Sequence, residues 1–283
     1  MLVRDRSVLG ERRIQMSMRV LLNILFVSIL AVGIASAQMD FENAVAIWLF
    51  DDGAGDEVED ISGNDNMGTI MGDYKWVAGK FGGALEFDGV STIVDCGVGE
   101  SLDFVGQQNF SISVWAISNT NNITAGMFVW KALGCSTWAQ YGFGVGAIEA
   151  NDAQPNKLNF YYRTTNSGTE EVVIDDDHFP ENEWVHCVGT YDGSKLRIYM
   201  NGEMVADKDS SGVPWASTES VYIGGDPGCG IRYIWSGAMD ELIIFNKTLS
   251  DAEIKDLTKG FELSGAVLPE GKLAATWADI KSQ

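Results

Sequence analysis

The stretch from Asp51 to Asn64 is rich in residue types that could bind a metal ion. It combines several carboxylates with glycines and an asparagine, although the spacing is not that of an EF-hand. Calcium prefers six to eight oxygen ligands from carboxylates, amides and backbone carbonyls. This composition predicts a calcium site with Asp51 and Asp60 among its ligands. The alternative is that both carboxylates accept hydrogen bonds from the backbone of tight turns, which is common for Asp.

Aromatic residues in loops could bind a sugar, because sugars stack their apolar C–H faces on aromatic rings. Trp138, Trp215 and Tyr233 fall in stretches rich in Gly and Ser, which favours surface positions. We expect these three to form a glycan platform. The wider set of candidate aromatics also includes Trp130, Tyr141 and Trp235. The alternative is that such rings pack in the core, as expected for Trp48, Trp115, Trp184 and Tyr191.

Catalytic chemistry has little support in the sequence. Retaining glycanases need two carboxyl groups about 5–5.5 Å apart. Asp240 and Glu241 are adjacent, and adjacent side chains in a strand point to opposite faces. The two histidines, His178 and His186, accompany no convincing Ser or Cys nucleophile motif. We therefore expect a protein that is not an enzyme.

Short β-rich runs separated by turn residues must position all these groups. The strongest hairpin signals are Asp88-Gly89, Asp192-Gly193 and Asn201-Gly202. Near the carboxyl end, Ser250 and Glu253 form a capping-box pattern that predicts a short helix over 251–258. Many short strands with one late helix indicate a two-sheet antiparallel sandwich.

The last predicted strand, over 238–245, carries an acidic residue among apolar ones. Strand alternation would place Asp240 on the same face as Leu242 and Ile244. A buried carboxylate is very costly without a partner. We therefore expect Asp240 to have a hydrogen-bond or ion partner.

Several of these segments together resemble the laminin G-like, or concanavalin A-like lectin/glucanase, jelly-roll family. In chain order they are Trp48–Gly55, Asp60–Asn64 with Gly68, Gly83–Gly89, Phe110–Trp115, Trp184–Gly193, Leu196–Gly202 and Trp235–Ser250. The resemblance extends from about Phe41 to Gly260. It implies an all-β, two-sheet antiparallel jelly-roll sandwich with a short C-terminal helix. This fold hosts lectins, adhesion modules, binding domains and glycanases, so it does not fix the function.

The resemblance also bears on the sites. If the first and last strands are neighbours, as in the family, Asp240 joins Asp51 and Asp60 as a ligand of a structural Ca²⁺ ion. The glucanase relatives carry paired carboxylates as E-x-D-x-x-E or E-x-D-x-E, and neither pattern occurs here. We expect a non-catalytic binding module that recognises a glycan or an extracellular protein. The alternatives are a glycoside-acting enzyme with another carboxylate arrangement and a purely structural cell-surface module.

Residues 1–37 have the features of an export signal. Basic residues precede an apolar run from Val20 to Ile34, and a small-residue cleavage pattern ends at Ala37. The run is short for a membrane span, which needs about 20 residues, although an uncleaved anchor is the alternative. We expect a secreted, cell-surface or periplasmic protein with no membrane span after cleavage. Its jelly-roll domain should cover 39–262, followed by a tail over 263–283.

Four cysteines allow three complete pairings, and export makes oxidation feasible. Cys187 lies in a strand where the family has an aliphatic residue, and Cys96 ends another strand, so both are expected as core thiols. Cys135 and Cys229 lie in glycine-rich loops and are the expected disulfide.

The chain has 19 basic and 40 acidic residues, a formal net charge of −21. Such a field repels nucleic acid and anionic membranes, so neither is an expected partner. It also attracts divalent cations, although solubility in an extracellular medium explains the charge equally well.

Overall fold

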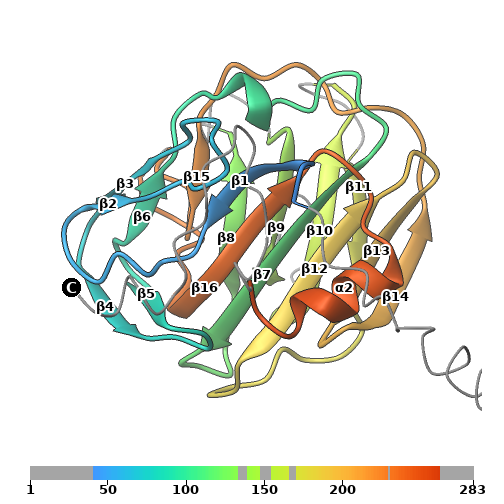
Figure 1. Cartoon of the computed structure of the whole chain (residues 1–283). Coiled ribbons are helices and arrows are strands. Elements are labelled where there is room, and N and C mark those ends of the chain that lie inside the picture. Colours follow the sequence, from blue (N-terminus) through green and yellow to red (C-terminus); the bar gives the residue numbers. More distant parts are fainter. Residues whose placement is uncertain (1–40, 133–138, 147–153, 166–169, 229, 262–283) are drawn as a thin grey trace, which may run out of the picture. The chain divides into compact units, whose positions relative to one another are not determined.

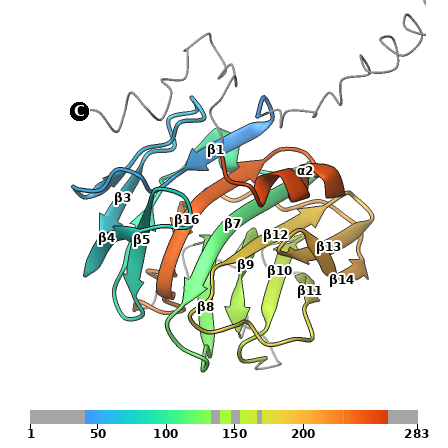
Figure 2. The same cartoon turned by 60° about the horizontal axis from the view of Figure 1, so that its bottom comes forward.

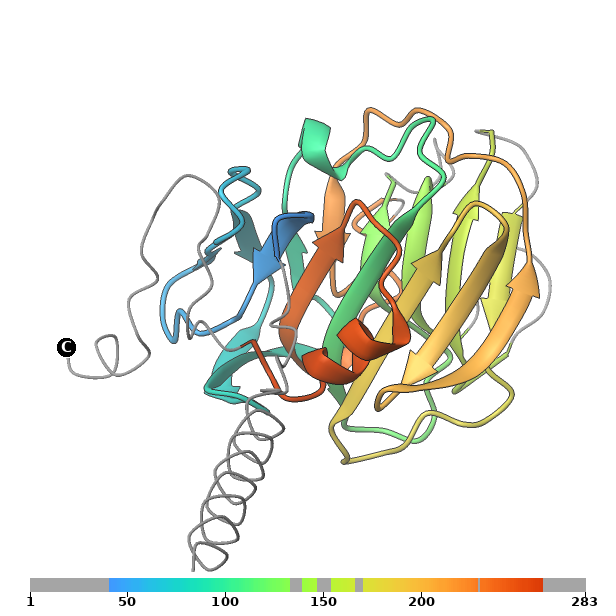
Figure 3. The ribbon, with the colours of Figure 1, turned by 45° about the vertical axis from the view of Figure 1, so that its right-hand side comes forward.

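The computed structural model describes residues 41–132, 139–146, 154–165, 170–228 and 230–261 (Figure 1). These residues form two antiparallel sheets of eight strands each, here called sheet A and sheet B. Figure 3 shows strands β12 to β14 of sheet A in front of the yellow-green strands of sheet B. The predicted two-sheet jelly-roll sandwich with one short C-terminal helix is therefore confirmed.

Sheet A has the strand order β14-β13-β12-β7-β16-β5-β4, and β1 also pairs with β16. Its strands are β1 (Ala44–Trp48), β4 (Tyr74–Ala78), β5 (Gly83–Asp88), β7 (Phe110–Ser118), β12 (Val185–Tyr191), β13 (Lys195–Met200), β14 (Glu203–Asp209) and β16 (Ser236–Phe245).

Sheet B has the order β11-β10-β9-β8-β15-β6-β3-β2. Its strands are β2 (Glu57–Val58), β3 (Gly68–Met71), β6 (Ile93–Asp95), β8 (Ala125–Lys131), β9 (Tyr141–Gly146), β10 (Leu158–Arg163), β11 (Glu170–Ile174) and β15 (Val221–Ile223). A 3-10 turn, η1, covers Glu100–Leu102. The strands β2, β3 and β4 were not predicted from the sequence.

The core lies between the inner faces of the two sheets and is rich in stacked rings. Phe110 of sheet A lies 5.4 Å from Phe160 of sheet B, measured between ring centroids. Tyr141 is fully buried in this core, and its hydroxyl donates to the carbonyl of Leu102. Trp235 is also fully buried, 4.8 Å from Phe128. Tyr141 and Trp235 are therefore core residues rather than a sugar platform.

Helix α2 (Asp251–Leu257) covers part of the outer face of sheet A, as Figure 2 shows. The predicted capping box is confirmed: the Ser250 hydroxyl accepts from the Glu253 amide, and the Glu253 carboxylate accepts from the Ser250 amide at 2.8 Å. Ile254 and Leu257 of the helix are buried in an apolar cluster with sheet residues such as Phe245. The helix thus closes this face with side chains of the chain itself.

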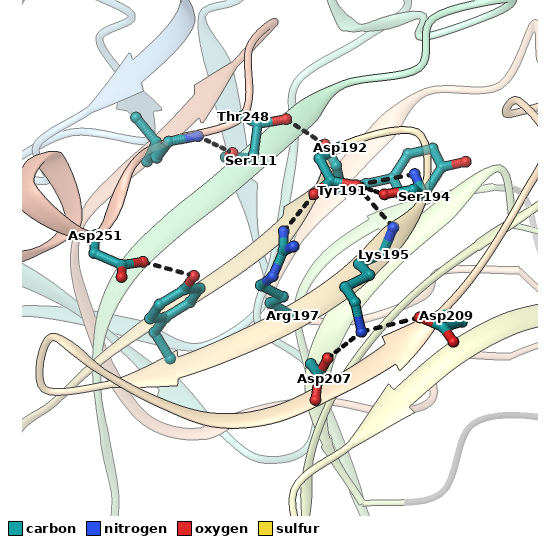
Figure 4. Close-up of polar contacts among 12 residues, drawn as sticks. Ser111, Tyr191, Asp192, Ser194, Lys195, Arg197, Asp207, Asp209, Thr248 and Asp251 are labelled. Carbon is teal, nitrogen blue, oxygen red and sulfur yellow. Dashed lines mark hydrogen bonds and ion pairs between the residues drawn. The ribbon is translucent and has the colours of Figure 1, made fainter.

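Polar contacts fix the same face around the helix start (Figure 4). The Tyr199 hydroxyl donates to Asp251 at 3.0 Å, and the Arg197 guanidinium contacts the Asp192 carboxylate at 2.6 Å. Lys195 lies between the carboxylates of Asp207 and Asp209. Pairs this exposed contribute at most about 1 kcal/mol each, so they fix local geometry more than they stabilise the domain.

A β-bulge in β16 changes the position of its acidic residues. Asp240 pairs with Trp115 and Ile243 with Ser113, so β16 has one extra residue here. Glu241 absorbs the irregularity with a positive φ of 46°. As a result Leu242 faces the main core, whereas Asp240 lies beside Trp115 on the outer face. The prediction that Asp240 shares a face with Leu242 and Ile244 is wrong, because it assumed unbroken alternation.

The two ends of the described domain meet. Phe41 precedes β1 and Phe261 follows α2, and their ring centroids are 4.4 Å apart. The backbone amide of Phe261 also donates to the Glu241 carboxylate at 2.7 Å. Among the described residues, no helix has the length and apolarity that a membrane crossing needs.

Candidate functional site

Three aromatic rings line up on the outer face of sheet B, the face turned away from sheet A. Trp130 of β8 lies 6.1 Å from Tyr161 of β10 and 5.7 Å from Tyr233, which follows β15. Trp130 and Tyr161 are fully buried, and Tyr233 is half-buried. We call Tyr161, Trp130 and Tyr233 the aromatic line. Tyr233 forms its accessible end.

A glycine in β9 makes the line continuous. Gly142 pairs with Trp130 on one side and with Tyr161 on the other. A Cβ atom at Gly142 would lie 2.5 Å from the Tyr161 ring, so the ring lies directly over the glycine. The alternating glycines of β9 therefore face outward, while Phe143 and Val145 face the core.

The loop that presents Tyr233 is closed at its base by a buried acid. Asp226 is fully buried and accepts from the Gly228 amide and the Arg232 Nε, each at 2.8 Å. The backbones of Asp226 and Arg232 also exchange two hydrogen bonds of 2.9 and 3.0 Å. This arrangement holds the Arg232 guanidinium 4.8 Å from the centroid of the Tyr233 ring.

Tyr233 itself has a left-handed backbone with φ of 57°. Such a conformation costs about 1–3 kcal/mol in a bulky residue and concentrates at functional sites. The Tyr233 carbonyl accepts from the Met127 amide at 2.9 Å, which holds the strained residue against β8. Tyr233 is thereby held beside Trp130, with its side chain half-buried.

Buried polar atoms without hydrogen-bond partners accompany the aromatic line. Among the described residues of strands β8 to β10 and the adjoining loop they include Trp130 Nε1, Gln140 Oε1, Asn159 Oδ1 and Trp215 Nε1. The strand pairing places Trp130 beside Gly142, and Asn159 beside Gly144. An unpaired buried polar group costs about 1–3 kcal/mol, so these atoms reduce the stability gained from packing on this face.

Of the three predicted sugar-binding aromatics, Tyr233 lies on this face, and the backbone of Trp215 contacts residues at its edge. Tyr233 ends the aromatic line, and half-buried Trp215 accepts from the Gln140 side chain through its carbonyl. The Trp215 amide donates to the Arg163 carbonyl at 3.0 Å, which ties it to the end of β10. Trp138 lies outside the described residues.

Asp60 is already saturated with hydrogen bonds. Its carboxylate accepts from the amides of Ile47, Ser62 and Asn66, each at 2.9 Å. It also accepts from the Ser62 hydroxyl and the Asn66 side-chain amide. These five bonds use the acceptor capacity of a carboxylate, so the turn-forming alternative accounts for Asp60.

Asp51 and Asp240, in contrast, approach one another. Asp51 accepts from the Gly83 amide at 2.5 Å, and Asp240 Oδ2 accepts from the Phe81 amide at 2.8 Å. A Cβ atom at Gly79 would lie 2.5 Å from Asp240 Oδ2 and 2.1 Å from the Gly83 carbonyl oxygen, so oxygens crowd this corner. Among the residues that the structure describes, Asp240 Oδ1 has no hydrogen-bond partner, and it is buried.

Burial shifts the titration of this corner. Desolvation, with the nearby charge of Asp51, raises the pKa of Asp240 to about 7. Desolvation, with the charge of Asp240, raises the pKa of Glu241 to about 8. Within the described part of the chain, no group of three or more His, Cys, Asp or Glu side chains is arranged to hold a metal ion. A cation here would need backbone carbonyls beside the two aspartates.

Comparison with known proteins agrees with this architecture. The sequence model of the concanavalin A-like lectin/glucanase superfamily matches residues 93–255. The chain belongs to this superfamily. No curated protein sequence matches it.

Solved structures similar to this superfamily member include domain 4 of AbnA, a GH43 extracellular arabinanase from Geobacillus stearothermophilus, in complex with arabinotriose. That match has a TM-score of 0.58 and 17% identity, and covers 76% of this chain and 98% of the domain. The binding domain of Paraclostridial Mosquitocidal Protein 1 matches with a TM-score of 0.59 and 15% identity over 77% of this chain.

The binding domain of Botulinum neurotoxin DC, in complex with rat synaptotagmin II, matches with a TM-score of 0.59 and 14% identity over 77% of this chain. This chain spans about half the length of both toxin domains, 52% and 51% respectively. At such identities the likeness concerns the fold alone.

The acidic pair of this superfamily member is poorly placed for catalysis. Asp240 is fully buried and Glu241 is 6% exposed, both on sheet A rather than beside the aromatic line. The bulge means that they do not simply alternate between faces, as we had expected from the sequence. His186 is buried against Ser113, and desolvation lowers its pKa to about 3. It is therefore a neutral residue of the sheet.

The structure describes two of the four cysteines, Cys96 and Cys187, and both agree with the expectation from the sequence. Cys96 and Cys187 are free and buried, and burial raises the pKa of both thiols. Their expected role as core thiols is confirmed. Cys135 and Cys229 lie outside the described residues, so their disulfide stays a prediction.

The site has members that sequence reasoning missed. Tyr161, Gly142, Asp226 and Arg232 meet only through strand pairing and loop closure, which leave no contiguous motif. One signal was available: Gly142 and Gly144 alternate with apolar residues in β9, which is typical of strands where another group approaches the backbone closely.

Proposed function

We propose that this protein is a non-catalytic binding module that recognises a glycan at the aromatic line. The observation that carries the proposal is Tyr233, which has a left-handed backbone conformation and whose ring contacts both Trp130 and an arginine that a buried aspartate holds in place. Aromatic rings with convergent polar groups are the usual surface for small polar ligands.

Similar domains support a binding role without fixing the ligand. Their structures include complexes with arabinotriose, with SialylT and with synaptotagmin II. An extracellular protein is therefore the second candidate ligand. The half-buried ring of Tyr233 at the end of the aromatic line favours a glycan, because sugars stack their apolar C–H faces on aromatic rings.

A glycan-array screen of the exported chain tests the proposal. Tyr233→Ala and Trp215→Ala should each weaken binding at least tenfold with little change in melting temperature, because neither ring is in the core. Trp138→Ala tests the remaining predicted aromatic in the same assay. Tyr74→Ala is the matched control, since Tyr74 is a half-buried ring on β4 of sheet A. Binding unaffected by Tyr233→Ala and Trp215→Ala, or no glycan bound, would contradict the proposal.

We also propose that the chain is exported and that a structural Ca²⁺ ion binds beside Asp51 and Asp240. The unpartnered, buried Asp240 Oδ1 supports a cation, because a buried carboxylate needs a compensating charge. Asp51 and Asp240, with backbone carbonyls such as those of Phe50 and Gly83, would hold the ion. Bound there, calcium would neutralise the two carboxylates and tie the β4–β5 turn to β16.

A further inference from the structure

We infer that strand β4 pairs with the same strand of a second copy of this chain. The two strands lie antiparallel, so that sheet A continues from one copy into the other. This self-association goes beyond the proposed function and does not depend on it. Three features of β4 point to it: an unpaired backbone edge, two half-buried rings beside that edge, and a residue order that is complementary to itself.

Strand β4 forms one end of sheet A, and β14 forms the other (Figure 2). It pairs with β5 on one side only. Among the described residues, no backbone hydrogen bond joins the other side of β4 to any segment. An unpaired edge presents a row of N–H and C=O groups that an added strand can bind. The backbone of β4 is therefore available to another chain.

The other three sheet ends are protected in the usual ways. Strand β14 carries four charged residues among its seven, and its pairing with β13 contains a register shift. Strand β11 has two glutamates among its five residues, and β2 is only two residues long. Charges, bulges and short edge strands all hinder pairing between edges. In β4 only Lys75 is charged, so this end is the least protected.

Two aromatic rings make the inner side of this edge apolar. Tyr74 and Trp76 pair with core residues of β5 and pack against the core, yet both are only half-buried. Their ring centroids lie 6.4 Å apart. Aromatic residues are enriched at interfaces between proteins, where each ring buries a large area. A strand added beside β4 would cover the part of both rings that is now exposed.

The order Tyr-Lys-Trp-Val-Ala is complementary to itself when two strands pair antiparallel around Trp76. Trp76 then faces Trp76 of the second copy, and Lys75 faces Val77 of the second copy, on the outer side of the sheet. Lys75 keeps its own partner, because its ammonium lies 3.4 Å from the Glu86 carboxylate on β5. No like charges lie directly opposite one another. The same pairing of two β14 strands would bring its acidic first and last residues together, which is unfavourable.

The size of the contact limits its strength. A pair of five-residue strands buries little surface, and the formal net charge of −21 opposes the approach of two copies. We therefore expect a reversible dimer that is populated at about 100 μM protein, as is usual for small interfaces.

Sedimentation velocity of the exported chain between about 5 and 500 μM tests the inference, because a reversible dimer forms by mass action. We expect the monomer to give way to a dimer over this range. Val77→Lys places like charges opposite one another at two symmetric positions, so it should raise the dimer Kd about tenfold. Val77→Glu places a carboxylate opposite Lys75 of the second copy and should lower the Kd about threefold.

Val205→Lys and Val205→Glu are the matched controls, because Val205 is an exposed valine on β14, at the other end of sheet A. Both should keep the Kd of the parent. Combining Lys75→Glu with Val77→Lys exchanges the two charges across the junction and should restore the dimer that Val77→Lys weakens. This restoration keeps the test decisive even where Val77→Lys lowers the melting temperature.

A chain that stays monomeric at every concentration would overturn the inference and leave the proposed glycan binding standing. A dimer weakened by Val205→Lys but not by Val77→Lys would use another edge, and this too would overturn the inference. Equal effects of Val77→Lys and Val77→Glu on the Kd would overturn the antiparallel pairing around Trp76.

Discussion

Two aspartates of the same chain, Asp60 and Asp240, show opposite ways of burying a carboxylate. Asp60 accepts five hydrogen bonds from residues of its own turn and the neighbouring β1. Asp240 is more deeply buried, yet one of its oxygens has no partner and its pKa is raised to about 7. Both looked like calcium ligands in the sequence.

The difference teaches that burial alone does not identify a metal ligand. Where backbone amides converge on a carboxylate, the negative charge is satisfied and nothing more is needed. Where a second carboxylate is the neighbour, as Asp51 is for Asp240, the charge is unfavourable until a proton or a cation arrives. Asp60 should therefore be structural under all conditions, and Asp240 should respond to pH and calcium.

The largest expected effect is that of Asp60→Ala. It leaves the buried amides of Ile47 and Asn66 without an acceptor, so we expect a loss of about 3–5 kcal/mol in the free energy of unfolding. Urea titration with and without calcium measures this. The loss should be the same in both buffers. If the loss of unfolding free energy appeared only with calcium present, Asp60 would be a calcium ligand. The contrast with Asp240 would then be wrong.

The second effect concerns pH. Asp240 and Glu241 have folded pKa values of about 7 and about 8, above their unfolded values. A raised folded pKa gives stability that is complete below the unfolded pKa and is lost as pH rises through the folded pKa. In chelator, the melting temperature should therefore fall by roughly 5–10 °C between pH 4.5 and pH 8.

Millimolar calcium should abolish most of that fall, because the ion replaces the protons. Asp240→Asn keeps an acceptor for the Phe81 amide but removes the charge. This variant should show a shallower pH dependence and no calcium response. An unchanged calcium response in Asp240→Asn would mean that the ion binds at another site.

A smaller effect is expected for Ser62→Ala. It removes one of the five donors of Asp60 and a bond to the Val45 carbonyl. The remaining four bonds still satisfy the carboxylate, so we expect a loss of about 1 kcal/mol. Chemical denaturation at constant pH measures it. A loss as large as that of Asp60→Ala would mean that the turn collapses as a unit.

The smallest effect is that of Asp52→Ala, which serves as the matched control. Asp52 is exposed, and its carboxylate accepts from the Glu59 amide at 3.1 Å. A surface substitution of this kind usually changes stability by less than about 0.5 kcal/mol. A larger change in calcium buffer alone would indicate that the acidic loop, rather than the Asp240 corner, binds the ion.

Local chemistry explains which parts of the fold could be predicted. Asn201 and Gly202 both have positive φ, 51° and 83°, and form the predicted hairpin between β13 and β14. The capping box at Ser250 could be predicted equally well. Both the turn and the capping box depend only on residues that are close together in the sequence. The short, partly exposed strands β3 and β4 lack such signals, and their pairing depends on distant strands.

The site was only partly predictable for the same reason. Tyr233 and Trp215 were identified by their loop composition. Trp130 and Tyr161 meet only because Gly142 pairs with both of their strands. The bulge at Glu241 was also invisible, because nothing in the apolar run around it marks an extra residue. Asp240 was therefore chosen correctly for its burial and assigned to the wrong face.

The contact between Phe41 and Phe261 has a mechanical consequence. Since both ends of the domain leave from one place, tension between them would act beside β1 instead of along the length of the sandwich. It would peel β1 from β16 one hydrogen bond at a time, which resists force far less than shearing a whole strand. If both ends of the domain were attached to other structures, the domain would unfold at a low pulling force. If only one end were attached, no pulling force would act across the domain.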